Sequence, residues 1–335
     1  IPRPWYTGRM RKMAIWLLLC ALAPLLSGCA GPQKRQYEFY DAFDTVIRLT
    51  AYTRDEASFR RLCEQAEAEF LRYDAIFDRY EAHEGVQGVW ALNHAQGEAT
   101  PVEPELLELL LLAQEWYAVC DRVNVAMGAV TDIWHAARES GALPSQEALE
   151  AAAAHTDFSL VEVDAAAGTV RLRDPALSLD FGALAKGYAA ERIAQALGEE
   201  TLLIDAGGNV VAAGKPGDGR AAWDIAVSHP DGGVLCVVPV ADGCAVTSGG
   251  SQRYFTVDGV RYHHIIDPDT LYPANLYRQT TVFCADSALA DWLSTSAFLL
   301  EYEDSRALVE SMGAKGIWIL PDGEVRASDG LLPNE

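Results

Sequence analysis

The 335-residue sequence predicts an α+β fold, in which helices and mixed β-sheets follow one another along the chain. Stretches with apolar residues at helical spacing alternate with short runs rich in β-branched residues. Turn signals separate several of these runs, the strongest being Asp258-Gly259. Half of the residues are hydrophobic, which suffices for a sizeable core, and the length predicts one large domain or two intertwined ones.

Residues 1–29 are predicted to be a signal region that lies outside the fold. Three basic residues (Arg9, Arg11 and Lys12) precede an apolar run, Ala14–Leu26, that is too short to cross a bilayer comfortably. The run ends in Leu-Ser-Gly-Cys, which resembles a bacterial lipobox with Cys29 as the lipidated residue. An ordinary cleaved signal is the alternative. We therefore expect an exported protein that a lipid on Cys29 anchors to the extracytoplasmic face of the cell membrane.

The overall charge excludes some classes of partner. A net charge of -22 and a pI near 4.6 argue against nucleic acid or an anionic lipid surface as the main partner. An anionic ligand would need local help from a metal ion or from backbone amides.

Cysteine usage predicts free thiols. Apart from Cys20 and Cys29, five cysteines remain, and no Cys-x-x-Cys pair is present to indicate a zinc site or a thioredoxin-type motif. An odd number cannot all pair, and most of them lie in apolar stretches.

In the first half of the chain we expect a polar tether over 30–38, followed by the main domain over 39–330. The segment Tyr80–Gly97 has no period and is predicted to be a loop. The other expected elements are a strand (Tyr40–Tyr52), an amphipathic helix from Asp55, a Leu-rich helix (Pro104–Val119), a loop and short helix (Asn124–Ala137), a helix capped by Pro144-Ser145, and two strands (Ser159–Val163, Thr169–Arg173).

The second half is predicted to be mostly β-structure. A strand, Thr201–Asp205, ends at paired glycines, Gly207 and Gly208, that favour a tight turn. The later elements are the strands Trp223–Ser228, Val234–Val240, Cys244–Thr247, Arg253–Val257, Arg261–Ile266 and Gln279–Cys284, a helix (Ser287–Leu300), and a hairpin of Gly316–Leu320 with Glu324–Ala327.

The segment from Ser178 to Arg192 combines groups that suit a metal and a phosphate. It is predicted to open as a short strand, turn at Gly182 and continue as a helix. Asp180 would lie just before the helix N-terminus, whose free N–H groups favour anions. Lys186 would lie in the first turn, where a cation opposes the helix dipole, so we expect it to have an anionic partner. The simpler interpretation is a helix-capping Asp and a surface Lys.

Another set of oxygen donors lies on the predicted helix Ser287–Leu300. Asp291 and Thr295 are spaced i, i+4, which places both side chains on one face. Two such oxygens suit a hard cation such as Mg²⁺, with phosphate and water as the remaining ligands. Taken alone, this spacing more often marks a solvated face.

Taken together, these clusters resemble the ApbE-type FAD:protein FMN transferases, from about Tyr40 to Leu320. The resemblance implies an ApbE-like, T-fold-related architecture of two lobes with FAD in the cleft between them. Its markers are Phe43-Asp-Thr45, Tyr80, Leu92-Asn93, Asn124–Trp134, Leu179–Tyr188, Asp205–Gly208, Thr247–Gly249, Arg253–Phe255, His264–Pro268 and Ala290–Thr295.

The resemblance also implies an activity and a set of roles. Family members bind FAD and Mg²⁺, transfer FMN to a Thr or Ser hydroxyl of a target protein, and release AMP. The target here would be an exported or membrane redox subunit. The implied metal ligands are Asp291, Thr295 and the carbonyl of Ala183. The implied FAD contacts are Phe43, Tyr80, Asn124, Val125, Ala126, Asp180 and Lys186, and His264 matches the functional histidine.

Physical chemistry supports three of these roles. His264 can take the proton from the acceptor hydroxyl, because neutral imidazole is a base near pH 7. Lys186 would add positive charge at the pyrophosphate. Asp267 could orient His264, although Asp-Pro also starts turns. Tyr80 or the region of Trp134 could stack the isoalloxazine, or be core aromatics.

The sequence departs from the family pattern at four positions. Leu271 stands where Gly is usual, so we expect a strained residue or a differently shaped turn. Asn124 and Ala126 stand where Asp and Thr are common, and Glu191 replaces a frequent Asp. Two other functions therefore remain open: a Mg²⁺-dependent FAD pyrophosphatase, and a non-catalytic flavin-binding lipoprotein.

Overall fold

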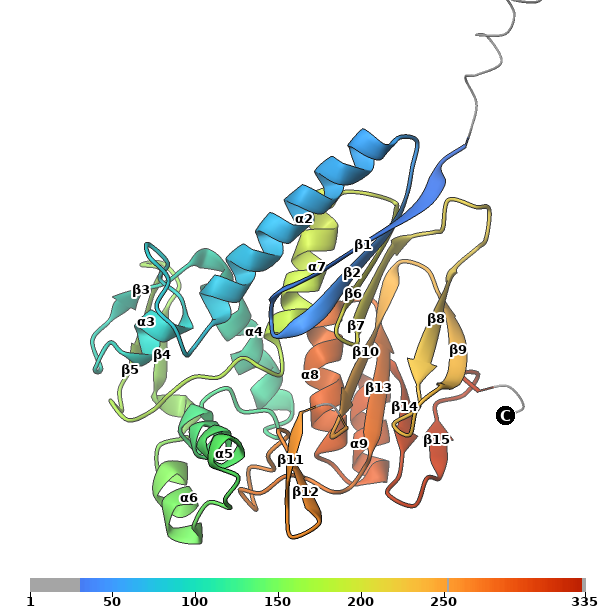
Figure 1. Ribbon diagram of the computed structural model, residues 1–335. Coiled ribbons are helices and arrows are strands. Elements are labelled where there is room, and N and C mark those ends of the chain that lie inside the picture. Colours follow the sequence, from blue (N-terminus) through green and yellow to red (C-terminus); the bar gives the residue numbers. More distant parts are fainter. Residues whose placement is uncertain (1–30, 252, 333–335) are drawn as a thin grey trace, which may run out of the picture.

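A computed structural model describes residues 31–251 and 253–332 (Figure 1). Its main sheet has eight strands in the order β1-β2-β6-β7-β10-β13-β14-β15, with every neighbouring pair antiparallel. These strands are β1 Gln33–Ala42, β2 Thr45–Thr53, β6 Thr201–Ala206, β7 Asn209–Gly214, β10 Gly243–Gly249, β13 Gln279–Cys284, β14 Lys315–Ile319 and β15 Val325–Ala327.

Four helices cover one face of this sheet (Figure 1). They are α2 (Glu56–Phe77), α7 (Ala185–Leu197), α8 (Ser287–Phe298) and α9 (Tyr302–Ser311). The central one, α8, packs against both β10 and β13, and nearly all of its side chains are buried. The opposite face carries the hairpin of β8 (Trp223–Ser228) and β9 (Val234–Val240), whose apolar side chains form a smaller core with the sheet.

The remaining elements form a second region beside the end of the sheet (Figure 1). The hairpin β11–β12 packs Phe255 and Tyr262 against Trp134 of α5. The elements are α3 Val89–Asn93, β3 Thr100–Pro101, α4 Pro104–Val119, α5 Gly128–Ser140, α6 Gln146–Ala153, the 3₁₀ turn Phe158–Leu160, β4 Val161–Asp164, β5 Thr169–Leu172, β11 Tyr254–Val257 and β12 Val260–His263.

The α+β class is confirmed, and several elements have their predicted bounds. The helix Pro104–Val119 and the strands Trp223–Ser228, Val234–Val240 and Gln279–Cys284 match residue for residue. Asp55 and Ser145 cap their helices with side-chain oxygens, and Gly198 ends α7 in the left-handed conformation. The five cysteines of the described part are free thiols, as expected.

Other local predictions were wrong. Tyr40–Tyr52 is a hairpin, because Phe43 and Asp44 take positive φ values of 55° and 50° and reverse the chain. The strand β1 begins at Gln33, so most of the expected tether over 30–38 is sheet. The predicted loop Tyr80–Gly97 contains α3, and the strand expected at Ser178 is a single bridge to Met127.

The elements that were not predicted include β3, β7 and α9. The signal region and Cys29 lie outside the described residues. Within the described residues, no helix is long and apolar enough to cross a membrane.

Candidate active-site cleft

A cleft of about 1390 Å³ opens between the end of the main sheet and the second region of the molecule. This volume exceeds the range of about 300–1,000 Å³ usual for small ligands, so it has room for a dinucleotide. The predicted site residues that line it are Phe43, Tyr80, Asn124, Asp180, Ala183, Lys186, His264, Asp291 and Thr295. Val125, Ala126 and Asp267 are not among its lining residues.

Asp291 is held in the cleft wall by the close approach of α7 and α8. Its Oδ2 accepts a hydrogen bond of 2.8 Å from the backbone N–H of Gly187. A Cβ at Gly187 would lie 2.3 Å from the carbonyl oxygen of Ser287, so only glycine fits there. Glu191 accepts a hydrogen bond from the Ser287 N–H at 3.0 Å, which joins the same two helices one turn later.

The carboxyl group of Asp291 carries a perturbed proton affinity. The residue is 3% exposed, and burial raises its pKa, while the charge of Lys186 and the Gly187 N–H partly oppose that rise. A buried carboxylate with so little compensation favours a cation beside it.

Thr295 lies one turn further along α8 and joins a small hydroxyl cluster. Its Oγ1 is 3.1 Å from Ser248 Oγ, which in turn lies 2.8 Å from Ser294 Oγ. The three residues that the family resemblance implies as metal ligands, Asp291, Thr295 and Ala183, all line the cleft and would offer a carboxylate, a hydroxyl and a carbonyl. These are all oxygens, which fits a hard divalent cation such as Mg²⁺. In the described part of the chain no three His, Cys, Asp or Glu side chains cluster as a metal site would require, so substrate oxygens and water would complete the shell.

Asn209 is a polar residue of this wall that sequence reasoning missed. It follows the Gly207-Gly208 turn, is 1% exposed, and lies beside Asp291, whose pKa it helps to lower. Its Nδ2 makes no well-formed hydrogen bond to the described residues. The sequence feature that could have pointed to Asn209 is the glycine pair Gly207-Gly208 directly before it, at the end of a buried strand.

Lys186 and His264 also line the cleft. Lys186 lies near both Asp291 and His264, because its charge lowers the pKa of each. Its Nζ has a long contact of 3.4 Å with the Gly182 carbonyl, and no ion pair to a described residue is recorded. Asp291 is therefore the anionic partner expected for Lys186, and the two interact through their charges without a direct ion pair.

His264 follows β12 and opens onto the cleft. Its Nδ1 lies 3.3 Å from the carbonyl oxygen of Arg253. The side chain is exposed, yet it sits deep among cleft walls, and desolvation there together with the charges of Arg253 and Lys186 lowers its pKa. His264 is thus a neutral imidazole at neutral pH.

Asp267 does not orient His264. Its Oδ1 accepts hydrogen bonds from the backbone N–H groups of Asp269 (2.8 Å) and Thr270 (3.0 Å). The carboxylate stabilises the turn that begins at Asp267, which is the alternative role of an Asp-Pro pair. The catalytic role predicted for Asp267 was wrong.

The segment Asn124–Ala126 makes local hydrogen bonds beside Asp180. The Asn124 side chain bonds to the Thr156 carbonyl (2.8 Å) and to the Ala126 N–H (2.8 Å). The Val125 carbonyl accepts from the Asp180 N–H at 2.8 Å. Val125 thereby holds the backbone of Asp180, and Asn124 holds that of Ala126. Contact of these residues with FAD stays a prediction, and of the three only Asn124 lines the cleft.

Asp180 itself belongs to a cluster around Arg79 that the sequence did not predict. Arg79 is 8% exposed and bonds to Asp180 (2.9 Å) and Thr131 (2.6 Å), with an ion pair to Asp132 (2.8 Å). Burial would raise the pKa of Asp180, but the Arg79 charge, the Gly182 N–H and the Thr131 hydroxyl outweigh it and hold the pKa low. The carboxylate stays ionised in the cleft wall.

Comparison with known proteins decides the family. The model of the ApbE family matches residues 43–318. The chain belongs to the ApbE family. A FAD:protein FMN transferase of Treponema pallidum is 34% identical over 95% of this chain and 94% of its own length, and one of Klebsiella pneumoniae is 31% identical over 77% and 80%. The crystal structure of an ApbE protein from Thermotoga maritima superposes with a TM-score of 0.81 at 28% identity, covering 89% of this chain and 97% of that one.

Relatives named as transferases place this ApbE-family chain among enzymes, as the sequence predicted. The structure also separates the two aromatic candidates of the ApbE cleft. Trp134 is buried, donates its Nε1–H to the Leu271 carbonyl at 2.8 Å, and stacks on Tyr262, so it is mainly a core residue. Tyr80 is 54% exposed, and its ring centroid lies 4.9 Å from that of His135 and 5.3 Å from Cζ of Arg79, so it is the more accessible of the two aromatics.

The ApbE-family glycine position taken by Leu271 is strained, as expected. Its φ is 61°, in the left-handed region that costs a side chain about 1–2 kcal/mol. The side chain is buried in the cluster around Trp134, so packing offsets the strain.

Leu271→Gly should therefore destabilise the protein in spite of relieving the backbone. Loss of a buried Leu side chain costs about 2–5 kcal/mol, whereas relief of the strain gains about 1–2 kcal/mol, so the net loss reaches up to about 4 kcal/mol. Urea unfolding at neutral pH measures the difference. A variant more stable than the wild type would show that packing at this site is weak.

Arg79→Met should be the more damaging change to stability. It leaves the Asp180 carboxylate, which is 23% exposed, without its buried charged partner, and breaking a buried pair costs about 3–5 kcal/mol, so we expect a loss near the lower end. The control is Arg72→Met, which removes an arginine whose ion pairs are on the surface and costs about 0–1 kcal/mol. Equal losses in the two variants would contradict the structural role of Arg79.

Proposed function

We propose that this ApbE-family protein transfers FMN from FAD to a Thr or Ser hydroxyl of a target protein and releases AMP. The observation that carries the proposal is the meeting of Asp291, Thr295, Lys186 and His264 in one cleft of dinucleotide size. Relatives that match nearly the whole chain are named FAD:protein FMN transferases, which supports the same reaction.

FAD would lie along the cleft. The chain as a whole is strongly acidic, whereas the charges that line the cleft nearly balance. Its cations are Arg48, Arg79, Arg122, Arg138, Lys186 and Arg253, and its acids are Asp44, Asp74, Asp78, Glu81, Asp180, Asp205 and Asp291. The cations would offset part of the negative field that a pyrophosphate meets. The residues proposed to contact FAD are Phe43, Tyr80, Asp180 and Lys186, with Asn124 at the edge of the cleft.

Asp291, Thr295 and the Ala183 carbonyl would hold Mg²⁺. When bound, the ion supplies charge neutralisation at the pyrophosphate oxygens. The protein's own part is to present fixed oxygens from α8, a helix buried on all sides. Lys186 at the start of α7 adds a second positive charge on the same side.

The transfer exchanges one phosphorus–oxygen bond for another. The acceptor hydroxyl oxygen attacks the phosphorus of the FMN half, and the bond from that phosphorus to the bridging oxygen breaks. AMP leaves with the bridging oxygen and its electron pair. His264 takes the hydroxyl proton, for which its lowered pKa keeps the imidazole neutral and ready.

A FAD pyrophosphatase is the second candidate. It is the same cleavage with water as the acceptor, and the exposure of His264 to the open cleft favours water access. A purely flavin-binding role has less support, because it requires neither the metal donors nor His264.

The acceptor is proposed to be an exported or membrane redox subunit. A lipid on Cys29 would hold both proteins at the same extracytoplasmic membrane face. No nucleic acid is expected to bind, given the acidic chain.

Mass spectrometry of an acceptor domain tests the proposal. The domain is incubated with residues 30–335 of this chain, FAD and Mg²⁺, and parallel reactions contain EDTA or the Asp291→Ala protein. A covalent FMN adduct that disappears in both controls supports the transferase. Free FMN and AMP without an adduct support the pyrophosphatase, and intact bound FAD supports the flavin-binding protein.

A further inference from the structure

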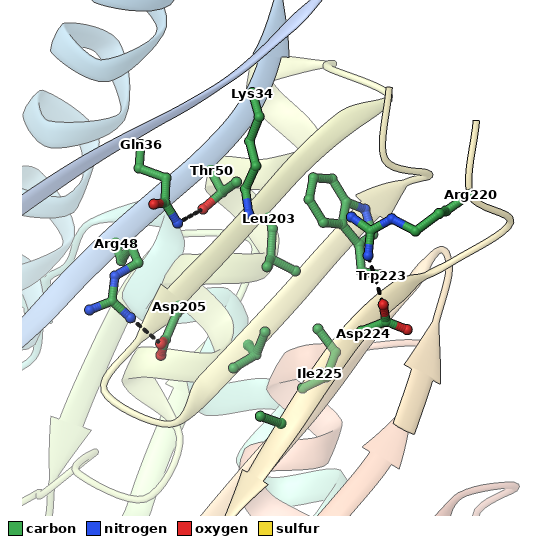
Figure 2. A pocket seen from close by; sticks show the side chains of 12 residues that line it. Lys34, Gln36, Arg48, Thr50, Leu203, Asp205, Arg220, Trp223, Asp224 and Ile225 are labelled. Carbon is green, nitrogen blue, oxygen red and sulfur yellow. Dashed lines mark hydrogen bonds and ion pairs between the residues drawn. The ribbon is translucent and has the colours of Figure 1, made fainter. Parts of the chain in front are cut away.

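A second hollow lies next to the cleft, on the outer face of the main sheet. Figure 2 shows Lys34 and Gln36 of β1 and Thr50 of β2 on one side, facing Trp223 and Asp224 of β8 on the other. Its volume of about 250 Å³ is below that usual for small-molecule pockets, which is about 300–1,000 Å³. It suits a short stretch of extended chain better than a second nucleotide.

One side of this groove is an open strand edge. In the described part of the chain β8 pairs with β9 and with no other strand. Asp224 stands opposite Pro239, which has no N–H, so this pair is a non-hydrogen-bonded one. The N–H and C=O of Asp224 therefore point away from β9. Because backbone direction alternates with a period of two residues, the N–H and C=O of Ala226 point away from β9 as well.

Two contacts further along agree with this assignment. The His229 N–H donates a hydrogen bond to the Gly233 carbonyl, on the β9 side. The backbone groups of the odd-numbered residues therefore point toward β9. The Ser228 carbonyl accepts a hydrogen bond of 2.9 Å from the Gln279 side chain, so it points away from β9. The even-numbered residues of β8 thus point their backbone groups away from β9, and those of Asp224 and Ala226 form the open edge.

The groove is continuous with the active-site cleft. Arg48, Asp205, Val210, Ile225 and Ala226 line both hollows. The chain that follows β8 runs on into the cleft wall, where Ser228 and His229 also line it. A strand laid along β8 would therefore lead from the outer surface to the cleft.

We propose that the groove receives an extended segment of the acceptor protein, which pairs with the free edge of β8 and leads its hydroxyl to His264. This inference rests on the proposed function, since it supplies the protein partner that FMN transfer requires. Backbone pairing gives affinity in such strand addition and alternate side chains give selectivity. Lys34, an exposed cation in the groove with no recorded ion pair to a described residue, selects a carboxylate on the incoming segment.

Three variants test the groove without touching the cleft lining. Asp224→Pro removes the unpaired N–H, and Asp224→Asn removes the same charge and the ion pair with Arg220 but keeps the N–H. Gln36→Trp fills the groove from an exposed position on β1. The readouts are the KM for an acceptor domain, measured by covalent FMN, and the release of free FMN from FAD in water.

The expected result is a KM for the acceptor domain raised about tenfold in Asp224→Pro, because one backbone hydrogen bond is lost and the approaching strand is displaced. Gln36→Trp should raise it similarly, and Asp224→Asn should stay near the wild type. Water hydrolysis should be unchanged in all three. Wild-type KM values in both Asp224→Pro and Gln36→Trp would overturn the proposal.

Amide hydrogen exchange separates failure of the groove from failure of the transferase. If the wild-type protein forms no adduct, the proposed FMN transfer is wrong. Docking in the groove is then tested separately, by amide hydrogen exchange with the acceptor domain present. Slower exchange at Asp224 and Ala226 supports docking there, and unchanged exchange overturns it. Slow exchange without acceptor, in a protein that elutes as a dimer, would assign this edge to a second copy of the chain and also overturn the proposal.

Discussion

Asp291→Ala is expected to reduce FMN transfer at least about a thousandfold, the largest effect of any single change. A metal that stabilises developing charge is worth several kcal/mol, and about 1.4 kcal/mol corresponds to a factor of ten in rate. Asp291 is the one carboxylate in the proposed donor set. The measurement is the rate of covalent FMN incorporation at saturating FAD and Mg²⁺.

Thermal stability gives a second readout that does not depend on activity. Mg²⁺ at about 100 times its Kd should stabilise the wild type by about 2.7 kcal/mol and leave Asp291→Ala unchanged. Without metal, the raised pKa of Asp291 means that its contribution to stability is present below the unfolded pKa and is lost as pH rises through the folded pKa. Asp291→Asn should then stabilise the metal-free protein at neutral pH.

The matched control is Glu303→Ala, which removes an exposed acid on α9. It should keep both the activity and the Mg²⁺ stabilisation. An Asp291→Ala protein that still responds to Mg²⁺ would place the ion elsewhere.

His264→Gln is expected to slow transfer by about 10²–10⁴-fold while FAD affinity stays close to that of the wild type. The reason is that His264 accepts a proton in the step itself and its pKa leaves it neutral beforehand. Rapid-quench measurement of FMN incorporation, with flavin binding measured separately by fluorescence, distinguishes the two effects. His155→Gln is the control, since His155 pairs with Asp174 and does not line the cleft.

The pH profile tests the same assignment. A base works in its unprotonated form, so activity should fall on the acid side as pH drops through the lowered pKa of His264. The midpoint of that fall should lie below the ordinary value of about 6.5. A midpoint at or above this value would mean that another group accepts the proton.

Much of the fold was predictable because periodicity is a local property. Pro104–Val119 and the helix of Asp291 and Thr295 were identified from spacing alone, and so was the face that both donors share. Turn chemistry was harder to read. Asp44 follows Phe43 in a reversal with two positive φ values and no glycine, so the hairpin carried no usual signal.

Contacts between distant residues could not be predicted from the sequence. Arg79 and Asp180 are 101 positions apart, and nothing in either neighbourhood specifies the other. Asp291, Thr295 and His264 line one cleft only because α8 and the chain after β12 meet there. Asp267 illustrates an ambiguity of chemistry, because a carboxylate that starts a turn and one that orients an imidazole look alike in sequence.

If a lipid on Cys29 anchors the chain as proposed, the first strand of the sheet would separate the cleft from the bilayer. β1 has ten residues and ends at the Phe43 turn, which forms part of the cleft rim (Figure 1). At about 3.3 Å per residue the strand is about 30 Å long, comparable with the thickness of the hydrocarbon core of a membrane. With the lipid on Cys29, β1 would act as a rigid spacer. An acceptor buried close to the headgroups would be out of range, and one that carries its hydroxyl on an equally tall domain or a long flexible arm would be within it.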